Sequence, residues 1–350
     1  MTQTHPPLKR EPSGVGSLLI RLTLALVMLL AGGWGAFALW YHALGPLALR
    51  VIVIGLWLTA CIGATVSLRR RRFPAALFGV SFLLLLAWWH TLQPSHNRRW
   101  ADDVSRLLGG DVKGDIVTLY NVRNFSWRTT SNYTPRWETR EYDLSQLASA
   151  DLILSYWMGP AIAHTLVSFG FTDGRQLVFS LEIRKERDEA FSAVAGFFRQ
   201  YETVLVASDE RDIVLTRTNA RGEDVYLYRL NLPPAALRTA FLGYVEQANA
   251  LARTPAFYNS LTSNCTTIVF DLARLIAPGL PLDYRLLASG YFAEYAYDQQ
   301  GLTPGVPFDT LHERGRITQR ALEAGDTPDF SRRIREGVPG ISQSAPATLR

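Results

Sequence analysis

Cysteine is scarce in this chain. Of its 350 residues only Cys61 and Cys265 are cysteines, the first in an apolar stretch and the second in a polar one. A disulfide between them is therefore not expected, and no cysteine–histidine spacing typical of a zinc site is present. The sequence indicates neither a metal nor any other cofactor.

Clusters of basic residues mixed with aromatic residues are missing as well. The formal net charge is +5, and four of the positive charges form one run, Arg69-Arg70-Arg71-Arg72. This pattern argues against a nucleic-acid partner. The chain also has no internal repeat and no phosphate-binding glycine loop, which argues against a solenoid and against a P-loop nucleotide site.

Apolar residues, by contrast, are abundant and unevenly distributed, because the N-terminal quarter of the chain is almost continuously hydrophobic. It contains three apolar spans of about 20 residues or more, which at ~1.5 Å per residue can cross a hydrocarbon core ~30 Å thick. A cleaved signal peptide would account for only the first span. We therefore expect three transmembrane helices, over Leu18–Tyr41, Pro46–Leu68 and Phe73–Leu92.

The positive charges predict how these spans are oriented. Lys9, Arg10 and Arg21 lie at the start of the first span, and the arginine run joins the second span to the third. Both groups belong on the cytoplasmic side of a membrane. Three crossings then leave everything after Leu92 in the periplasm, so we expect a multi-pass protein of the bacterial inner membrane with a cytoplasmic N-terminus and the lipid bilayer as a partner.

The remainder of the chain has ordinary globular composition, and its periodicity predicts an α+β domain with an antiparallel sheet and packed helices. Strands are expected near residues 115–122, 137–144, 150–157, 164–171, 176–184, 203–207 and 225–230, and helices at 188–201, 234–251 and from 265 onward. We expect a cytoplasmic tail at residues 1–16 and a three-helix membrane anchor at 17–93. A juxtamembrane linker should follow at 94–114 and a periplasmic domain at 115–325. The last segment, 326–350, should be a poorly ordered C-terminal tail.

The clearest hairpin joins residues 164–171 to residues 176–184 through an Asp173-Gly174 turn. With a two-residue turn His164 would lie opposite Ile183, and a one-residue bulge would bring Glu182 there instead. The register of this hairpin therefore decides which side chain faces His164.

Cys265 is expected in the first turn of a helix. Ser263 and Asn264 are good N-cap residues, and Ile268 and Leu272 follow at helical spacing. At this position the unpaired N–H groups and the positive end of the helix dipole stabilise a thiolate, as a nucleophilic cysteine requires. The alternative is that Cys265 is a small buried apolar residue, which is the commoner role of a lone cysteine.

A thiolate nucleophile needs a base. After the apolar spans the chain has three histidines: His96 in the expected linker, His164 on the hairpin and His312 in a polar context typical of the surface. His164 is the best candidate because a strand can hold it rigidly toward the start of the Cys265 helix. A structural role for a histidine at the head of an apolar strand is the alternative.

Several ordered motifs then make a resemblance specific. The sequence is similar to the Lnb N-terminal periplasmic domain family over roughly residues 115–275, while the three apolar spans lie outside the resemblance. The motifs that carry it are Asn121–Phe125, Gly159–Phe171, Ser180–Arg184, Phe198–Tyr201 and Phe257–Thr267.

The resemblance implies a papain-like fold of the circularly permuted NlpC type with a Cys–His acyl-transfer site. Lnb itself is an intramolecular transacylase that moves an acyl chain from the lipid of a bacterial lipoprotein to the amino group of its lipidated cysteine. The matching positions are Cys265 as nucleophile and His164 as base. For the orienting third group the sequence offers Glu182, with Ser180 behind it.

The oxyanion of such a reaction would be held by the Cys265 backbone N–H and a second donor. Asn259 is the candidate for that donor, although a turn-forming role fits an asparagine there equally well. Asn264 and Thr266 are expected to shape the first turn of the helix.

Three functions are compatible with these observations. The leading hypothesis is a membrane-anchored thiol acyltransferase or hydrolase that forms a thioester and acts on lipoprotein or lipid acyl groups. A cell-wall peptide amidase or peptidase is the second, because NlpC-type relatives cut peptidoglycan peptides. The third is a membrane-tethered module that binds without catalysis.

Overall fold

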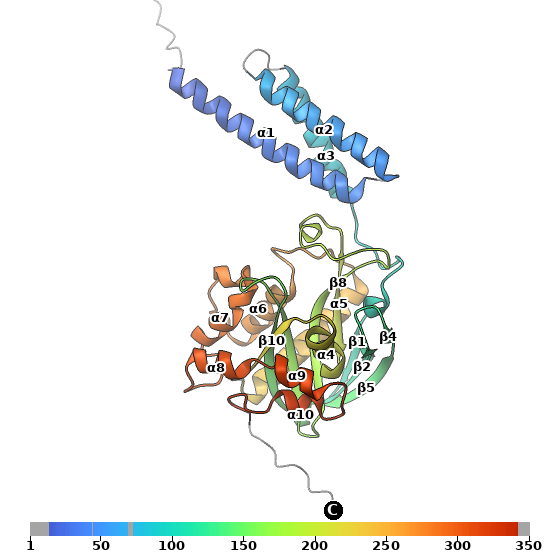
Figure 1. The fold of residues 1–350 in the computed structure, drawn as a ribbon, viewed down its shortest axis with the longest axis vertical. Coiled ribbons are helices and arrows are strands. Elements are labelled where there is room, and N and C mark those ends of the chain that lie inside the picture. The colour runs from blue at the N-terminus through green and yellow to red at the C-terminus, as the bar shows by residue number, and fades with distance from the viewer. Residues whose placement is uncertain (1–13, 44, 69–72, 342–350) are drawn as a thin grey trace, which may run out of the picture. The chain divides into compact units, whose positions relative to one another are not determined.

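The computed structural model describes residues 14–43, 45–68 and 73–341 and divides the chain into two compact units, Met1–Gln93 and Pro94–Arg350 (Figure 1). The arginine run at 69–72 and the tail residues 1–13 lie outside the described residues. The N-terminal tail was expected to extend to residue 16, but the first helix already begins at Gly14.

The first unit consists of three apolar helices, as predicted. Helices α1 (Gly14–His42), α2 (Leu47–Ser67) and α3 (Phe73–Thr91) are each long and apolar enough to cross a membrane. Most of their large apolar side chains are exposed, as expected of residues that face lipid. Close packing at Gly32 joins α1 to α2, because the Trp57 indole N–H donates to the Gly32 carbonyl at 2.8 Å.

The second unit is built on an eight-stranded sheet in the order β1-β2-β9-β8-β7-β6-β10, with β5 paired to β2. All pairs are antiparallel except β2 with β9. The strands are β1 (Gly109–Lys113), β2 (Ile116–Arg123), β5 (Trp137–Asp143), β6 (Leu147–Tyr156), β7 (Ala163–Phe171), β8 (Gln176–Arg184), β9 (Glu202–Ser208) and β10 (Asp224–Arg229). A small separate sheet pairs β3 (Ser126–Trp127) with β4 (Tyr133–Thr134).

Helices pack on both faces of the sheet, which explains why almost every residue of β7 and β9 is buried. Helices α5 (Pro234–Arg253) and α6 (Cys265–Ile276) pack on one face. On the other lie α4 (Glu210–Leu215), α9 (Thr318–Ala324) and α10 (Phe330–Ile334). Helices α7 (Phe292–Asp298) and α8 (Phe308–Gly315) cover the β6–β10 edge. The mixed α+β class is thereby confirmed.

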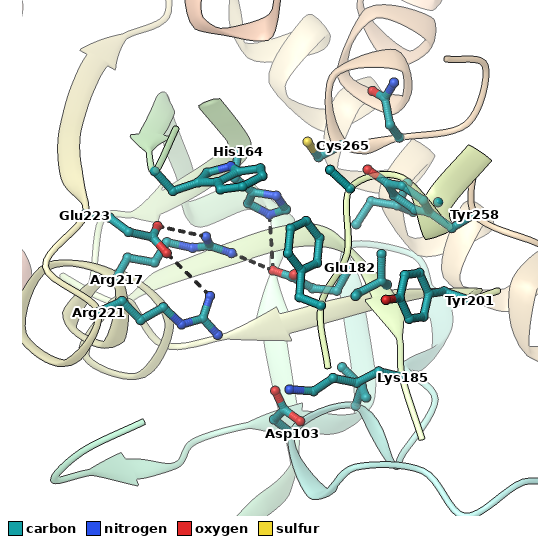
Figure 2. A pocket seen from close by; sticks show the side chains of 18 of the residues that line it. Asp103, His164, Glu182, Lys185, Tyr201, Arg217, Arg221, Glu223, Tyr258 and Cys265 are labelled. Atoms are coloured by element: carbon teal, nitrogen blue, oxygen red, sulfur yellow. Dashed lines mark hydrogen bonds and ion pairs between the residues drawn. The ribbon is translucent and has the colours of Figure 1, made fainter. Parts of the chain in front are cut away.

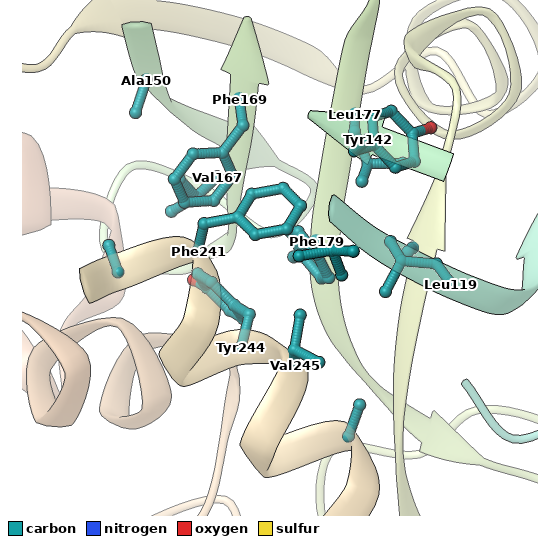
Figure 3. Packing of buried hydrophobic residues seen from close by; sticks show 14 of the residues in the cluster. Leu119, Tyr142, Ala150, Val167, Phe169, Leu177, Phe179, Phe241, Tyr244 and Val245 are labelled. Carbon is teal, nitrogen blue, oxygen red and sulfur yellow. The ribbon is translucent and has the colours of Figure 1, made fainter. Parts of the chain in front are cut away.

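The largest core cluster lies between the sheet and α5 (Figure 3). Phe241 and Tyr244 recur at helical spacing on α5 and pack against Phe169 and Phe179 of the central strands. The rings of Phe179 and Tyr244 are stacked with centroids 4.8 Å apart. Aromatic burial of this kind holds the central hairpin rigidly, and this hairpin carries His164.

Two segments that were expected to be irregular belong to the folded unit. Residues 94–114, predicted as a linker, contain a 3-10 turn at Asp102–Val104 and strand β1. Within the expected C-terminal tail, residues 326–341 contain α10, and residues 342–350 lie outside the described part of the chain. Arg335 follows α10 and pairs with the buried carboxylates of Asp151 and Glu210 at 2.7 and 2.5 Å. Such long-range partners leave no periodic signal in the sequence.

The helix expected at residues 188–201 is not formed. In its place is an extended loop with one 3-10 turn, Ala195–Phe197. The Tyr201 hydroxyl accepts from the Ser192 N–H at 2.9 Å and donates to the Ala190 carbonyl at 2.7 Å, so it replaces hydrogen bonds that a helix would have made. Close packing also constrains the loop, since a Cβ atom at Gly196 would lie 2.4 Å from the Ser260 hydroxyl oxygen.

Candidate active site

Helix α6 begins at Cys265, as the cap-type residues before it predicted. The Asn264 side-chain oxygen accepts from the backbone N–H groups of Thr266 and Thr267 at 2.9 and 3.0 Å, and the Thr267 hydroxyl oxygen accepts from the Asn264 N–H at 2.8 Å. This reciprocal capping box satisfies three donors of the first turn. The Cys265 N–H has no hydrogen-bond partner among the described residues, so it stays available to a ligand.

The loop before α6 is a tight turn. Asn259 and Ser263 exchange two backbone hydrogen bonds, and the Asn259 side-chain oxygen accepts from the N–H groups of Leu261 and Thr262 at 2.9 and 3.1 Å. Asn259 is not among the residues that line the cavity described below. The Asn264 amide donates to the Ser260 carbonyl at 2.9 Å. Both asparagines therefore shape the loop that presents Cys265.

The β7–β8 hairpin places His164 opposite Glu182, the outcome expected for the one-residue bulge. Val167 pairs with Phe179, and the same register continued toward the open end brings His164 opposite Glu182. His164 Nε2 lies 2.7 Å from the Ser180 hydroxyl oxygen and 3.1 Å from Glu182 Oε1. The Ser180 hydroxyl donates to the same Glu182 oxygen at 2.8 Å. Both candidates for the orienting group therefore contact one ring nitrogen.

Strand β7 and helix α6 are joined next to these two residues. The hydroxyl groups of Thr165 and Thr266 lie 2.9 Å apart in a buried hydrogen bond, and each threonine follows directly after His164 or Cys265 in the chain. Because Nε2 is engaged by Ser180 and Glu182, the ring nitrogen left for the sulfur is Nδ1. Figure 2 shows the Cys265 sulfur and the His164 ring on the same side of the pocket.

The electrostatics favour a thiolate next to an imidazolium. Burial raises the pKa of Cys265, but the charge of His164, its hydrogen bond to the sulfur and a hydrogen bond from the Thr165 backbone lower it below the ordinary value. For His164, burial and Arg217 lower the pKa, and the charges of Glu182 and Cys265 outweigh them and raise it to about 9. Each group thus stabilises the charged form of the other.

Arg217 forms a further layer behind this pair (Figure 2). It lies in the π-helical turn after α4 and donates to Glu182 Oε1 at 2.9 Å and to Glu223 Oε2 at 3.2 Å. The pKa of Glu182 is held well below its ordinary value, because the charges of His164 and Arg217 outweigh the effect of burial. Sequence reasoning missed Arg217 and Glu223, since neither lies in a local motif and both are joined to the site only by folding. Thr165 lies within the Gly159–Phe171 motif, but its contact with Thr266 also depends on folding.

The site opens into a cavity of about 1000 Å³. Cys265, His164 and Glu182 line it together with Tyr258, and the mouth carries large apolar side chains from several loops. The volume lies at the upper end of the range for ligand sites. No group of three or more His, Cys, Asp or Glu side chains that could hold a metal ion occurs among the described residues.

Comparison with protein families gives one result. The family model of the Lnb N-terminal periplasmic domain matches residues 133–290. The chain therefore carries an Lnb domain. This confirms the family recognised from the sequence motifs, and the matched range contains His164, Glu182 and Cys265. Comparisons with curated proteins and with solved structures gave no match.

The other histidines of the second unit lie apart from the site of the Lnb domain. His96 Nδ1 is 3.3 Å from an Arg184 nitrogen. His312 was expected at the surface, but it is half-buried, with its ring stacked 4.3 Å from that of Tyr226 and Nδ1 2.8 Å from the Tyr228 hydroxyl oxygen. Together with three candidate membrane helices, the Lnb domain indicates a membrane protein with a domain of a periplasmic family.

Replacing Glu182 with glutamine is expected to lower the pKa of His164 from about 9 toward its ordinary value of 6.5, because the carboxylate that stabilises the imidazolium is lost. The imidazolium, which in the native Lnb domain persists up to about pH 9, would then be lost near neutral pH. Titration of carbon-13-labelled histidine by NMR measures this change directly. Asp173→Asn, at the other end of the same hairpin, should leave the His164 titration unchanged; equal titrations in both variants would show that Glu182 does not set this pKa.

Proposed function

We propose that this protein is a membrane-anchored, cysteine-dependent acyltransferase or hydrolase that forms a thioester on Cys265. One observation supports this most directly. Cys265 begins a helix with its N–H unpaired, next to an imidazole whose other nitrogen is held by Ser180 and Glu182, and both side chains line the cavity. A cysteine with a purely structural role would need neither a neighbouring histidine nor a cavity through which a substrate can reach it.

The first step is acylation of the cysteine. The Cys265 thiolate attacks the acyl carbonyl carbon, the new C–S bond forms, and the carbonyl electrons become an oxyanion. On collapse the bond to the leaving group breaks, and the His164 imidazolium gives its proton to the departing oxygen or nitrogen. The products are a thioester on Cys265 and a neutral imidazole. The orienting contacts of Glu182 and Ser180 keep the ring in place while its charge changes.

The second step transfers the acyl group. An amine or a water molecule gives a proton to neutral His164 as it attacks the thioester carbonyl, and collapse of the second oxyanion breaks the C–S bond. Cys265 leaves as a thiolate, which restores the starting ion pair. An amine acceptor gives acyl transfer, and water gives hydrolysis. The substrate class that the Lnb domain suggests is an acyl chain of a lipoprotein or a lipid.

The chain order is consistent with the proposed scaffold, a circularly permuted papain-like domain of the NlpC type. Strand β7 with His164 precedes helix α6 with Cys265. The orientation proposed for the membrane helices, with a cytoplasmic N-terminus, places this domain in the periplasm. Only Leu92 and Gln93 separate the end of α3 at Thr91 from the start of the second unit at Pro94, so a short connection tethers the domain to the proposed membrane anchor.

Two donors would stabilise the oxyanion. The first is the Cys265 backbone N–H at the start of α6. For the second we propose Tyr258, because it lines the cavity beside Cys265, its hydroxyl group has no hydrogen-bond partner among the described residues, and its pKa is raised by burial and by the charge of Cys265 (Figure 2). A neutral phenol that stays protonated is a hydrogen-bond donor to an oxyanion at all physiological pH values.

The variant Tyr258→Phe is therefore expected to lower kcat by about 10²-fold, the typical effect of removing one oxyanion donor. The rate at which iodoacetamide alkylates Cys265 should stay unchanged, because alkylation forms no oxyanion. Measuring both rates on the same preparation separates the two effects. A parallel fall in both rates would indicate instead that Tyr258 only supports the loop.

The proposal is tested by trapping the thioester. The full chain in detergent micelles is incubated with a p-nitrophenyl fatty-acyl ester, and the acyl mass is located by peptide mass spectrometry before and after hydroxylamine, which cleaves thioesters. We expect a hydroxylamine-sensitive adduct on Cys265 that Cys265→Ser abolishes and Cys61→Ala, a change at the other cysteine, leaves in place. The absence of any adduct on Cys265, with the protein folded, would contradict thioester chemistry.

A further inference from the structure

Large apolar side chains gather around the mouth of the cavity. Six side chains that line it are each 40–55% exposed, although all are apolar or aromatic. We name this set the apolar rim; its members are Trp157, Met158, Phe191, Phe197, Leu261 and Leu287. Exposed apolar residues scattered singly need no explanation, but a contiguous group around a site marks an interaction surface.

The apolar rim is assembled from four separate segments of the chain. Trp157 and Met158 follow β6, Phe191 and Phe197 lie in the loop between β8 and β9, and Leu261 precedes α6. Leu287 lies directly after the 3-10 turn at Tyr284–Leu286. Segments so distant in sequence meet only in the folded domain.

Two of the rim segments contact one another. The rings of Trp157 and Phe191, from different loops, meet edge to face with centroids 5.1 Å apart. Phe191, Val194 and Phe197 lie in the loop that replaces the helix expected at residues 188–201, and all three are exposed.

A lipid surface fits the apolar rim better than water does. The rim combines tryptophan and phenylalanine with aliphatic residues, as membrane-interface segments do. The lining of the same cavity also includes the basic residues Lys185, Arg187 and Arg221, which can contact lipid headgroups. A bilayer is also the expected environment of the preceding part of the chain, because α3 is a candidate membrane span. It ends at Thr91, and the second unit begins at Pro94. Only Leu92 and Gln93 connect this span to the second unit.

We propose that the apolar rim inserts into the boundary between headgroups and acyl chains of the bilayer, so that the cavity opens toward lipid rather than toward water. An acyl chain would then enter the cavity without crossing the aqueous phase. This inference concerns where the domain docks, and it holds whether or not Cys265 is a nucleophile. A second protein or a second copy of this chain is the competing occupant.

The test measures the membrane depth of single sites in the full chain. Nitroxide spin labels are placed at Phe191→Cys and Leu287→Cys in a Cys265→Ser background, where the remaining Cys61 is buried. Val112→Cys and Leu322→Cys serve as matched controls, because these residues are apolar, 47% exposed and outside the cavity lining. Each protein is reconstituted in phosphatidylcholine nanodiscs, and the collision rates of the label with oxygen and with a nickel chelate are measured by EPR.

Oxygen concentrates in the acyl region and the nickel chelate in water, so insertion raises the ratio of the two collision rates. We expect this ratio to be several-fold higher at positions 191 and 287 than at positions 112 and 322. Equal ratios at all four positions would overturn the proposal. Protection from both reagents at 191 and 287 would overturn it too, because it would show that protein rather than lipid covers the apolar rim.

Discussion

The variant His164→Ala is expected to slow alkylation of Cys265 at pH 7 by on the order of 10²-fold. The imidazolium is the main group that lowers the pKa of the thiol, and without it burial alone would raise that pKa above the ordinary value of 9.0. A thiol with such a pKa is at most about 1% ionised at pH 7, and the thiolate is the reactive form. Acyl transfer, which also needs the proton of His164, should fall further.

This result is measured as the second-order rate of iodoacetamide alkylation between pH 5 and 10, with the modified cysteine identified by mass spectrometry. The matched control is His312→Ala, which removes a histidine of the same unit that does not line the cavity. That variant should keep the native rate at Cys265. If His164→Ala retains the native rate and pH profile, Cys265 and His164 are not coupled, and the proposed mechanism is excluded.

Replacing Arg335 with alanine is expected to destabilise the second unit by about 3–5 kcal/mol, the typical cost of removing one partner of a buried ion pair. Arg335 is 6% exposed and contacts two buried carboxylates, Asp151 at 2.7 Å and Glu210 at 2.5 Å. Without the guanidinium these charges are left unpaired in the interior. At about 2–4 °C per kcal/mol for a unit of this size, the thermal midpoint should fall by about 6–20 °C.

The neighbouring Arg332 provides the matched control. Its side chain is about half-exposed and pairs with Asp329 and Glu336, which flank the same short helix. Surface pairs contribute little, so Arg332→Ala should change stability by no more than about 1 kcal/mol. Unfolding of the full chain in detergent, followed by circular dichroism at one fixed heating rate, compares the variants. Equal midpoints for Arg332→Ala and Arg335→Ala would show that the ion cluster does not hold the C-terminal segment in place.

Elements with a strong local signal were predicted well. The three apolar spans became α1 to α3, and the Asp173-Gly174 turn gave the β7–β8 hairpin. Their signals are local, because membrane spans, turns and capped helices depend on residues that are close in sequence. The prediction of a helix at residues 188–201 was wrong because long-range contacts outweighed the local pattern. Its apolar spacing was overruled by the hydrogen bonds of Tyr201 and by the close packing of Gly196.

The candidate site shows the same division. Cys265 could be placed at a helix start from its cap residues, and His164 at the head of a strand, from the sequence alone. The hairpin register, which decides between Ile183 and Glu182 as the neighbour of His164, needed the structure, because a one-residue shift changes every cross-strand pair. Arg217 lies far from both in sequence and entered the site only through folding.

What this sequence determines by itself is its three helices apolar enough to cross a membrane, the α+β class of its second unit, its Lnb domain, and the placing of a cysteine at a helix tip and a histidine on a strand. All of these follow from short-range periodicity, capping and motif order. Tertiary structure alone decided the partners of His164, the buried charges behind them, the ion cluster around Arg335 and the apolar rim. These features join residues that are distant in the chain, and the free energy that selects them comes from burial and charge pairing, which only the folded state provides.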